Sequence, residues 1–291
     1  MACGIIIIDK PAGWTSQDVA AKLRGVFHER RIGHGGTLDP MATGVLPVFV
    51  GRATRGVEFF ESAEKEYVAG LRLGVETNTQ DTTGEVLAER PVSVSREQLE
   101  TVLQTFLGPQ EQIPPMYSAV KIGGKKLYEL ARQGKTVERK ARRIEILELE
   151  LLDGQGADWQ IRVLCSKGTY VRTLCHDIGQ ALGCGGCMSS LRRTRAGCYD
   201  LSQAVTMEAV TTMERPEDCL LPVDSMFRDC PACRVQENQL KAIFNGADIK
   251  VGPLADGRYR VYGPDGTFLM LGQARGGRMK TIKSFFEVSK P

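Results

Sequence analysis

The sequence has no apolar run long enough to cross a membrane. Its four isoleucines at positions 5–8 end at Asp9 and Lys10, whereas a transmembrane helix needs about 20 apolar residues. The opening residues MACGIIIIDKPAGW also lack the basic leader of a secretory signal. The sequence therefore predicts a cytoplasmic protein in which the isoleucines form a buried strand.

Histidine is scarce, and the common nucleotide-binding motifs are missing. Only His28, His34 and His176 occur, and they do not combine with carboxylates into a metal-ligand pattern. The chain has neither the Gly-Lys-Ser/Thr ending of a phosphate-binding loop nor a GxGxxG spacing. The sequence therefore predicts no cofactor and no metal.

The cysteines do not resemble a disulfide framework. Nine of them occur, an odd number in a chain without an export signal, which favours reduced thiols. Two CxxC pairs, Cys184 with Cys187 and Cys230 with Cys233, could in principle hold zinc, but 42 residues separate them, far more than in usual zinc sites. Small buried residues are the favoured interpretation, and a zinc site stays open.

The length and the charge distribution of the chain indicate its domain organisation and a possible binding surface. The 291 residues, 42% apolar and 25% charged, suffice for one large and one small domain. The net charge is only +3, but residues 121–143 contain nine basic and two acidic side chains and so carry +7, leaving −4 for the rest. A one-signed run of this density is either a solvated face or a phosphate-binding surface, and the tyrosines within or beside it favour nucleic acid.

Residue patterns predict five strands and three helices in the first 200 residues. Apolar runs bounded by Gly or Pro predict strands at 5–8, 45–50 and 67–73, and period-two alternation predicts a pair at 144–152 and 159–165. A first helix is capped by Thr15 or Ser16, a second starts with the capping box of Ser95 and Gln98, and a third spans 171–182.

The composition changes after about residue 230. The segments 258–262 and 268–271 flank Gly-Pro-Asp-Gly in a hairpin arrangement. We therefore predict a large domain over 1–230, which includes a basic RNA-contacting segment at 115–143, and a small β-rich domain over 231–291.

The most unusual segment runs from Gly33 to Pro47, GHGGTLDPMATGVLP. Pro40 biases Asp39 away from helical geometry, and the glycines let the backbone pass close to a bulky ligand. Such a loop can present one carboxylate to a substrate. A plain glycine-rich turn with Asp39 as a local cap is the alternative.

With Val48, this segment resembles the signature of the TruB family of pseudouridine synthases. Further matches follow in the family's order and together cover most of residues 4–200: Asp9-Lys10-Pro11, Lys65-Glu66-Tyr67, Asn78-Thr79-Gln80-Asp81, Pro115 to Lys121, Gly124 to Tyr128, Ser166 to Thr173 and Leu191-Arg192-Arg193. The C-terminal tail resembles the family's PUA-like RNA-binding module only loosely.

The resemblance implies an α+β fold, with a mixed, largely antiparallel central sheet flanked by helices and a small β-rich PUA-like C-terminal domain. It also implies isomerisation of uridine to pseudouridine at position 55 in the T-loop of tRNA, by base flipping. The expected partner is the T-arm of tRNA, bound by a monomer without an obligatory protein partner.

The resemblance also assigns residues. Asp39 is the expected nucleophile, Arg172 its cationic partner, and Tyr67 the residue that stacks on the flipped base and accepts or relays its C5 proton. The expected substrate-binding residues are His34, Lys10, Asp81, Tyr170 and Leu191, with Lys125, Lys126, Arg139 and Lys140 on a segment that closes over the T-loop.

Three alternatives remain open at this point. The chain could be the catalytic subunit of a guide-RNA-dependent rRNA pseudouridine synthase, although it lacks the long lysine-rich tails of that relative. It could be an RNA-binding or tRNA-folding protein without obligatory catalysis. A zinc-containing RNA-binding module is the third.

Overall fold

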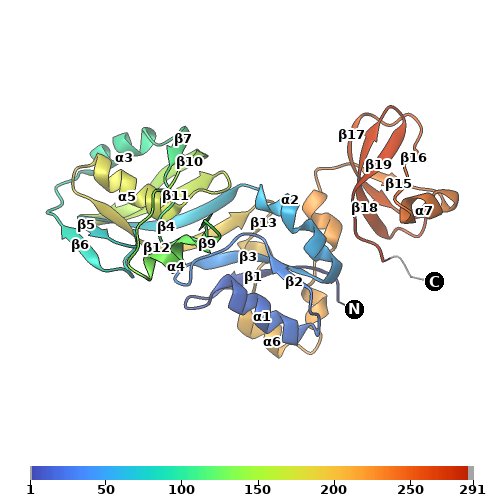
Figure 1. The fold of residues 1–291 in the computed structure, drawn as a ribbon, viewed down its shortest axis with the longest axis horizontal. Coiled ribbons are helices and arrows are strands. Elements are labelled where there is room, and N and C mark those ends of the chain that lie inside the picture. Colours follow the sequence, from blue (N-terminus) through green and yellow to red (C-terminus); the bar gives the residue numbers. More distant parts are fainter. Residues whose placement is uncertain (1, 288–291) are drawn as a thin grey trace.

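The computed structural model describes residues 2–287, and a ten-stranded mixed sheet forms its centre (Figure 1). Its strands are β1 (Gly4–Lys10), β2 (Ile32–His34), β3 (Thr43–Val50), β4 (Lys65–Leu73), β7 (Gly108–Gln112), β10 (Arg142–Gln155), β11 (Asp158–Cys165), β12 (Gly186–Ala196), β13 (Tyr199–Asp200) and β14 (Val205–Thr206). The order is β14-β1-β3-β12-β4-β11-β10-β7, with β2 added to β3 and β13 to β12. Only β1–β14 and β3–β12 are parallel pairs, so the largely antiparallel sheet is confirmed.

Helices connect the strands of this sheet, and one further helix, α7, lies in the C-terminal domain (Figure 1). The α-helices are α1 (Ser16–Val26), α2 (Val57–Glu61), α3 (Arg96–Gln104), α4 (Leu127–Ala131), α5 (Val171–Ala181), α6 (Met207–Thr212) and α7 (Glu237–Phe244); the 3₁₀ helices are η1 (Gly51–Gly56), η2 (Leu201–Gln203), η3 (Pro216–Cys219) and η4 (Val223–Phe227). Thr15 and Ser95 cap α1 and α3 with complete capping boxes, which satisfy backbone donors that the first turn leaves free. No helix among residues 2–287 is long and apolar enough to span a membrane.

The strands and helices predicted from residue patterns are confirmed, but β12 was missed. It lies between β3 and β4 in the middle of the sheet. Its sequence, GCMSSLRRTRA, has three arginines and no clean alternation, so period-two reasoning does not detect it. One of these arginines, Arg193, is among the largest fully buried side chains.

The main hydrophobic core lies between the sheet and the helices α1, α3, α5 and α6, and Figure 1 shows these helices beside the sheet. Helix α1 contributes Val19, Ala20 and Leu23, and α5 contributes Leu174 and Ile178. A second cluster contains Phe49, Phe60 and Tyr199. In β1 and β3 it uses the side chains that point to the other face of the sheet from those in the main core. Both faces of β1 and β3 are therefore covered, which explains why their sequences are nearly continuous apolar runs.

Two hairpins and a C-terminal domain complete the fold. The hairpins pair β5 (Val75–Thr77) with β6 (Val86–Glu89), and β8 (Lys121–Ile122) with β9 (Lys125–Lys126). A separate five-stranded sheet contains β15 (Ala232–Arg234), β16 (Ile249–Lys250), β17 (Gly257–Tyr262), β18 (Phe268–Arg275) and β19 (Arg278–Ser284). The predicted hairpin is β17–β18, and the β-rich C-terminal domain is confirmed.

The C-terminal domain contacts the large domain through both apolar and charged groups. Phe227 packs edge-on against Phe59 at 5.5 Å between ring centroids and also contacts Phe285. Arg55 donates to the carbonyl oxygen of Ser284 at 3.1 Å, and Lys283 pairs with Glu58. The boundary at residue 230 and the likeness to a PUA module stay predictions.

Candidate active site

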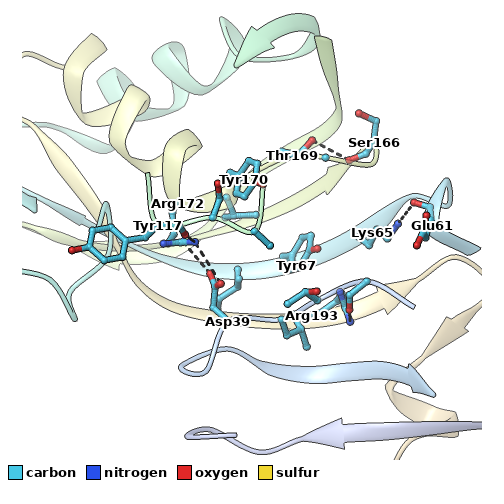
Figure 2. Close-up of a pocket in the computed structure, with 18 of the residues that line it drawn as sticks. Asp39, Glu61, Lys65, Tyr67, Tyr117, Ser166, Thr169, Tyr170, Arg172 and Arg193 are labelled. Atoms are coloured by element: carbon cyan, nitrogen blue, oxygen red, sulfur yellow. Dashed lines mark hydrogen bonds and ion pairs between the residues drawn. The ribbon is translucent and has the colours of Figure 1, made fainter. Parts of the chain in front are cut away.

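A pocket of about 420 Å³ opens where the loop before β3 faces β4, β12 and the start of α5. Asp39, Tyr67, Tyr170, Arg172 and Leu191 line it, as the resemblance implies. Figure 2 shows Asp39 and Arg172 pointing toward each other beside Tyr67. The topology explains this gathering, because β12 lies between β3 and β4 and brings residues distant in sequence to one place.

The loop that carries Asp39 is held at several points. Backbone hydrogen bonds link Gly13 to the carbonyl of Pro40 at 2.8 Å and Ala42 to that of Asp39 at 3.0 Å. The hydroxyl of Ser16, at the start of α1, accepts from the Leu38 amide at 2.9 Å. A Cβ at Gly44, where φ is +99°, would lie 2.2 Å from the carbonyl oxygen of Arg193. Only glycine therefore fits at this close approach of β3 and β12. Asp39 is therefore rigidly presented.

Lys10, expected at the rim of the pocket, is fully buried and does not line it. Its ammonium donates to the carbonyl oxygens of Trp14, Pro11 and Pro40 at 2.6, 2.9 and 3.3 Å. Burial lowers the pKa of Lys10 to about 8, although nearby Asp39 opposes this shift. Lys10 therefore supports the Asp39 loop from below and has no direct access to a ligand in the pocket.

Arg172 holds Asp39 through two contacts. Its Nε lies 2.9 Å from Oδ2 of Asp39, and its Nη2 lies 3.4 Å from Oδ1. Such a bidentate contact fixes the plane of the carboxylate as well as its position. Only 7% of the Arg172 side chain is exposed, compared with 35% for Asp39, so the pair presents the carboxylate and hides the guanidinium.

Further acceptors lock Arg172 in place. Its guanidinium donates to the backbone carbonyls of Tyr117 at 2.8 Å and Thr79 at 3.2 Å, and lies 3.6 Å from a carboxylate oxygen of Asp81. Asp81 is itself buried, and it accepts hydrogen bonds from Thr79 and Thr83. The structure thus places Asp81 behind Arg172, as a group that orients the arginine, and not among the pocket-lining residues.

The pKa of Asp39 is raised above its ordinary value. Burial is the largest cause, and the negative charge of Asp81 adds to it, whereas Arg172 and Lys10 oppose the shift. The pull of Arg172, expected from the resemblance to hold the pKa down, is therefore outweighed. A carboxylate that is poorly hydrated but still ionised at neutral pH is a stronger nucleophile than one in water.

The raised pKa predicts a shifted acid limb in the pH profile. If the ionised carboxylate is the reacting form, kcat/KM should fall with decreasing pH around the pKa of Asp39 in the free enzyme, which lies above the ordinary 3.8. The measurement is kcat/KM for pseudouridine formation across the acid range, limited to pH values at which the protein stays folded. An acid limb at or below 3.8 would contradict this prediction.

Aromatic and aliphatic side chains form the walls of the pocket. Tyr67 is 9% exposed and lies on β4, Leu191 lies on β12, and Tyr170 precedes α5. Gln112 fixes Tyr170 by exchanging hydrogen bonds of 2.8 and 3.1 Å with its backbone. Flat and branched apolar groups of this kind suit the faces of a planar ring.

The other predicted residues lie outside the lining. His34 ends β2, and its Nδ1 is buried without a hydrogen-bond partner among the described residues; burial lowers its pKa, and Arg193 adds to the effect. Lys125, Lys126, Arg139 and Lys140 belong to the basic segment. That segment reaches the pocket through Tyr117, Ser118, Ala119 and Tyr128, which line it.

Sequence reasoning missed two cations that line the pocket, Lys65 and Arg193. The ammonium of Lys65 donates to the carbonyl oxygens of Ala63 and Glu61 at 2.5 and 2.9 Å, and burial lowers its pKa to about 8. Arg193 is 1% exposed. Both stand in segments that match the family, so the signal was present, but burial of a charged residue cannot be inferred from the residue itself.

The two CxxC pairs lie apart in the fold. Cys184 and Cys187 are buried at the large sheet, with Cys187 in β12, whereas Cys233 lies in β15 of the C-terminal domain and Cys230 lies just before that strand. All nine cysteines are free, and residues 2–287 contain no group of three or more histidine, cysteine or acidic side chains placed to hold a metal. In the part of the chain that the structure describes, the four cysteines of these pairs are therefore not gathered into one site.

The chemistry available in this pocket is that of one oriented carboxylate. Asp39 can attack an electrophilic carbon, Arg172 can stabilise the charge that the carboxylate gains or loses, and the Tyr67 hydroxyl can exchange a proton. The aromatic and aliphatic walls suit a planar ligand. Such a set suits the transfer of a heterocyclic base at a sugar carbon better than hydrolysis, which needs an activated water.

Comparisons with known proteins agree with this arrangement. The N-terminal domain model of the TruB family of pseudouridylate synthases matches residues 24–171, and the C-terminal domain model of tRNA pseudouridylate synthase B matches residues 172–228. The tRNA pseudouridine synthase B of Syntrophomonas wolfei is 47% identical over 96% of both chains, and that of an Azoarcus species is 43% identical over 95% of this chain and 93% of its own. A solved Cbf5-Nop10-Gar1 complex contains a chain that is 28% identical, with a TM-score of 0.74, over 97% of this chain and 85% of that one.

The matched signature contains Asp39, and the matched segments supply Arg172 and Tyr67. This chain therefore belongs to the TruB family of pseudouridylate synthases.

Proposed function

We propose that this enzyme converts uridine 55 in the T-loop of tRNA to pseudouridine, with Asp39 as the nucleophile. The observation that carries the proposal is the Asp39–Arg172 pair inside a pocket walled by Tyr67, Tyr170 and Leu191. The curated relatives cited above are named as tRNA enzymes, which supports tRNA as the substrate. We further propose a cytosolic location, since nine free cysteines suit a reducing compartment. We also propose that the protein acts as a monomer.

The target base must leave the RNA stack to reach Asp39. Flipping a nucleotide costs a few kcal/mol, and stacking on one aromatic side chain returns about 1–3 kcal/mol per base. Tyr67 lies beside Asp39 in the pocket (Figure 2) and is held on a central strand, so its ring is ready without reordering. Tyr67 therefore offsets much of the flipping cost, and RNA contacts outside the pocket must supply the rest.

The reaction is an internal rearrangement. The bond between the sugar C1′ and N1 of uracil breaks, a new bond forms between C1′ and C5, and one proton leaves C5 while another arrives at N1. Atoms and electrons balance without an oxidant or a reductant, so the reaction requires no cofactor. In this proposal Asp39 supplies the attacking carboxylate, and Arg172 keeps it ionised and oriented.

The basic segment of residues 115–143 supplies contacts outside the pocket. Lys125 and Lys140 are exposed, Lys126 lies over Tyr128, and Arg139 donates to the carbonyl of Pro114 at 3.1 Å. Because Tyr128 and Tyr117 also line the pocket, RNA phosphates bound along this segment would lie beside the flipped base. The segment therefore fits the T-arm contact.

Charge removal in this segment should flatten the salt dependence of tRNA binding. Each phosphate contact contributes about 0.7–0.9 to the slope of log affinity against log salt concentration. Replacing the four cations by glutamine should therefore reduce that slope by about 3–4 if each of them contacts one phosphate. The measurement is the dissociation constant for tRNA at several salt concentrations; the variant combines Lys125→Gln, Lys126→Gln, Arg139→Gln and Lys140→Gln.

A matched control removes the same charge elsewhere. Exposed cations outside the segment and outside the C-terminal domain are replaced by glutamine: Lys22, Arg30, Arg96 and Arg215. This control should keep a slope near that of the wild type. An unchanged slope in the first variant, or an equal loss in both, would place the RNA footprint away from residues 115–143.

A guide-RNA-dependent rRNA enzyme is the weaker alternative. It is suggested by the fold shared with the Cbf5-Nop10-Gar1 complex, but at only 28% identity, compared with 47% for the first tRNA relative. Activity on an isolated T-arm hairpin, without guide RNA or partner proteins, separates the two functions. The stand-alone enzyme should modify such a hairpin, whereas a guide-dependent enzyme should not.

The test of the proposal is direct. Purified protein is incubated with unmodified tRNA, and pseudouridine is mapped by chemical modification and primer extension. We expect one modified position, uridine 55. Pseudouridine at a different position would overturn the site assignment, and its complete absence with correctly folded tRNA would overturn the proposed activity.

A further inference from the structure

Arg193 lies directly opposite Tyr67 in the sheet. The two residues are paired in the antiparallel register of β12 and β4, so their side chains emerge on the same face. Both line the pocket, and Figure 2 shows the Arg193 side chain below Tyr67, away from the Asp39–Arg172 pair. Arg193 is therefore placed to act on Tyr67 and not on Asp39.

The burial of Arg193 is costly and needs an explanation. Its Nε donates to the carbonyl oxygen of Val45 at 2.6 Å and its Nη2 to that of Gly36 at 3.2 Å. Within residues 2–287 no carboxylate forms an ion pair with it, whereas its neighbour Arg192 pairs with Asp9 at 2.8 Å. A buried charge without a counterion is strongly disfavoured unless another group compensates it. The site is thus built to receive negative charge.

A contact between Arg193 and the Tyr67 hydroxyl can have only one direction, because a guanidinium has donors only and the phenol oxygen must accept. In such a contact the proton of Tyr67 points away from Arg193. Burial raises the pKa of Tyr67, and the charge of Arg193 opposes that shift, so the resting side chain is a neutral phenol.

A neutral phenol cannot accept the C5 proton until it has released its own. The isomerisation needs one proton at N1 and removes one from C5, so a single phenol can serve both steps if its oxygen carries a negative charge in between. When Asp39 bonds to C1′ and the C1′–N1 bond breaks, the electron pair of the broken bond stays on N1 and takes the Tyr67 proton. C5 then displaces the Asp39 carboxylate from C1′, the phenolate takes the C5 proton, and Tyr67 is restored.

We propose that Arg193 is a positioning residue that directs the Tyr67 proton at the pyrimidine and holds the phenolate formed between the two proton transfers. The inference rests on the proposed function. It explains why a cation without a carboxylate partner lies opposite the pocket tyrosine. The fixed charge costs stability in the free protein and is compensated only during the reaction, as is common for preorganised active sites.

The test uses the full chain with Arg193→Met and Arg193→Lys. Arg192→Met is the matched control, because Arg192 is adjacent on β12, 42% exposed and outside the pocket lining. We expect the single-turnover rate at saturating tRNA to fall by about 100-fold in the Arg193 variants, with tRNA affinity within a few-fold of wild type. Arg192→Met should keep the wild-type rate.

A second readout separates positioning from general damage to the pocket. In D2O, which places deuterium on the Tyr67 hydroxyl, the Arg193 variants should show a larger isotope effect on the single-turnover rate than the wild type, because transfer of the Tyr67 proton to N1 has become the slow step. If Arg193→Met fails to fold, Arg193→Lys carries the test, since lysine keeps the charge but cannot reach both carbonyls and Tyr67 together.

Two outcomes would overturn the inference. One is a wild-type rate in a folded Arg193 variant, and the other is a slower rate with an unchanged isotope effect. Inactive wild-type protein would instead contradict the proposed function, so the two failures can be told apart.

Discussion

Asp39→Asn is expected to lower the single-turnover rate of pseudouridine formation by at least about 10⁴-fold, because it removes the attacking group. Affinity for tRNA should stay within a few-fold, since asparagine has the same shape and Arg172 remains anchored by the carbonyls of Tyr117 and Thr79. The measurement combines chemical mapping of pseudouridine with a binding titration. The protein should come from a host that lacks its own enzyme.

The same variant should be at least as stable as the wild type at neutral pH. The pKa of Asp39 is raised in the folded state, so ionisation of this carboxyl costs folding free energy once the pH exceeds the unfolded value, and the full cost is present above the folded value. Asparagine never ionises and avoids this cost. The matched control is Asp158→Asn, an exposed carboxylate paired with Arg72, which should leave the rate unchanged. Full activity of Asp39→Asn would remove Asp39 from the mechanism.

Arg172→Met is expected to affect both activity and stability. It leaves Asp81 buried without its cation and Asp39 without its main stabilising charge. Breaking a buried ion pair from one side costs about 3–5 kcal/mol, and the lower end applies here because Asp39 is partly exposed to the pocket. The rate at neutral pH should fall by at least about 100-fold, measured as kcat with saturating tRNA.

The pH profile identifies the cause of the Arg172→Met defect. Without Arg172, burial and Asp81 raise the pKa of Asp39 further, so the acid limb of kcat should move to higher pH and part of the activity should return in alkaline buffer. Arg162→Met is the control, because Arg162 pairs with Glu148 and Glu150 outside the pocket lining. A lower kcat with an unmoved acid limb would show that Arg172 acts through shape alone.

The burial of particular residues explains why some site residues were predicted and others were not. Asp39, Tyr67 and Arg172 lie in motifs whose residue types indicate a possible chemical role. The fold brings all three residues to one pocket. Lys10 and Asp81 belong to equally clear motifs but support other groups: Lys10 carries the Asp39 loop, and Asp81 orients Arg172. A motif shows that a residue matters but not whether it touches the ligand.

The fold shows a similar division. Helix caps at Thr15 and Ser95 and the alternating strands 144–152 and 159–165 are local signals, and the structure has these elements. Strand β12 carries no such signal, because it is buried by neighbours on both sides and its arginines serve the pocket and Asp9. Tertiary context overrides local pattern here.

The amino-acid sequence by itself determined the family and the local elements and pointed to Asp39 as the proposed nucleophile, because these depend on residues close together along the chain. Only the tertiary structure decided which charges are buried, which of them face the pocket and that Arg193 pairs with Tyr67. Those properties depend on which strands become neighbours. The parallel contact between β3 and β12 joins segments about 150 residues apart, and no local pattern encodes such a contact.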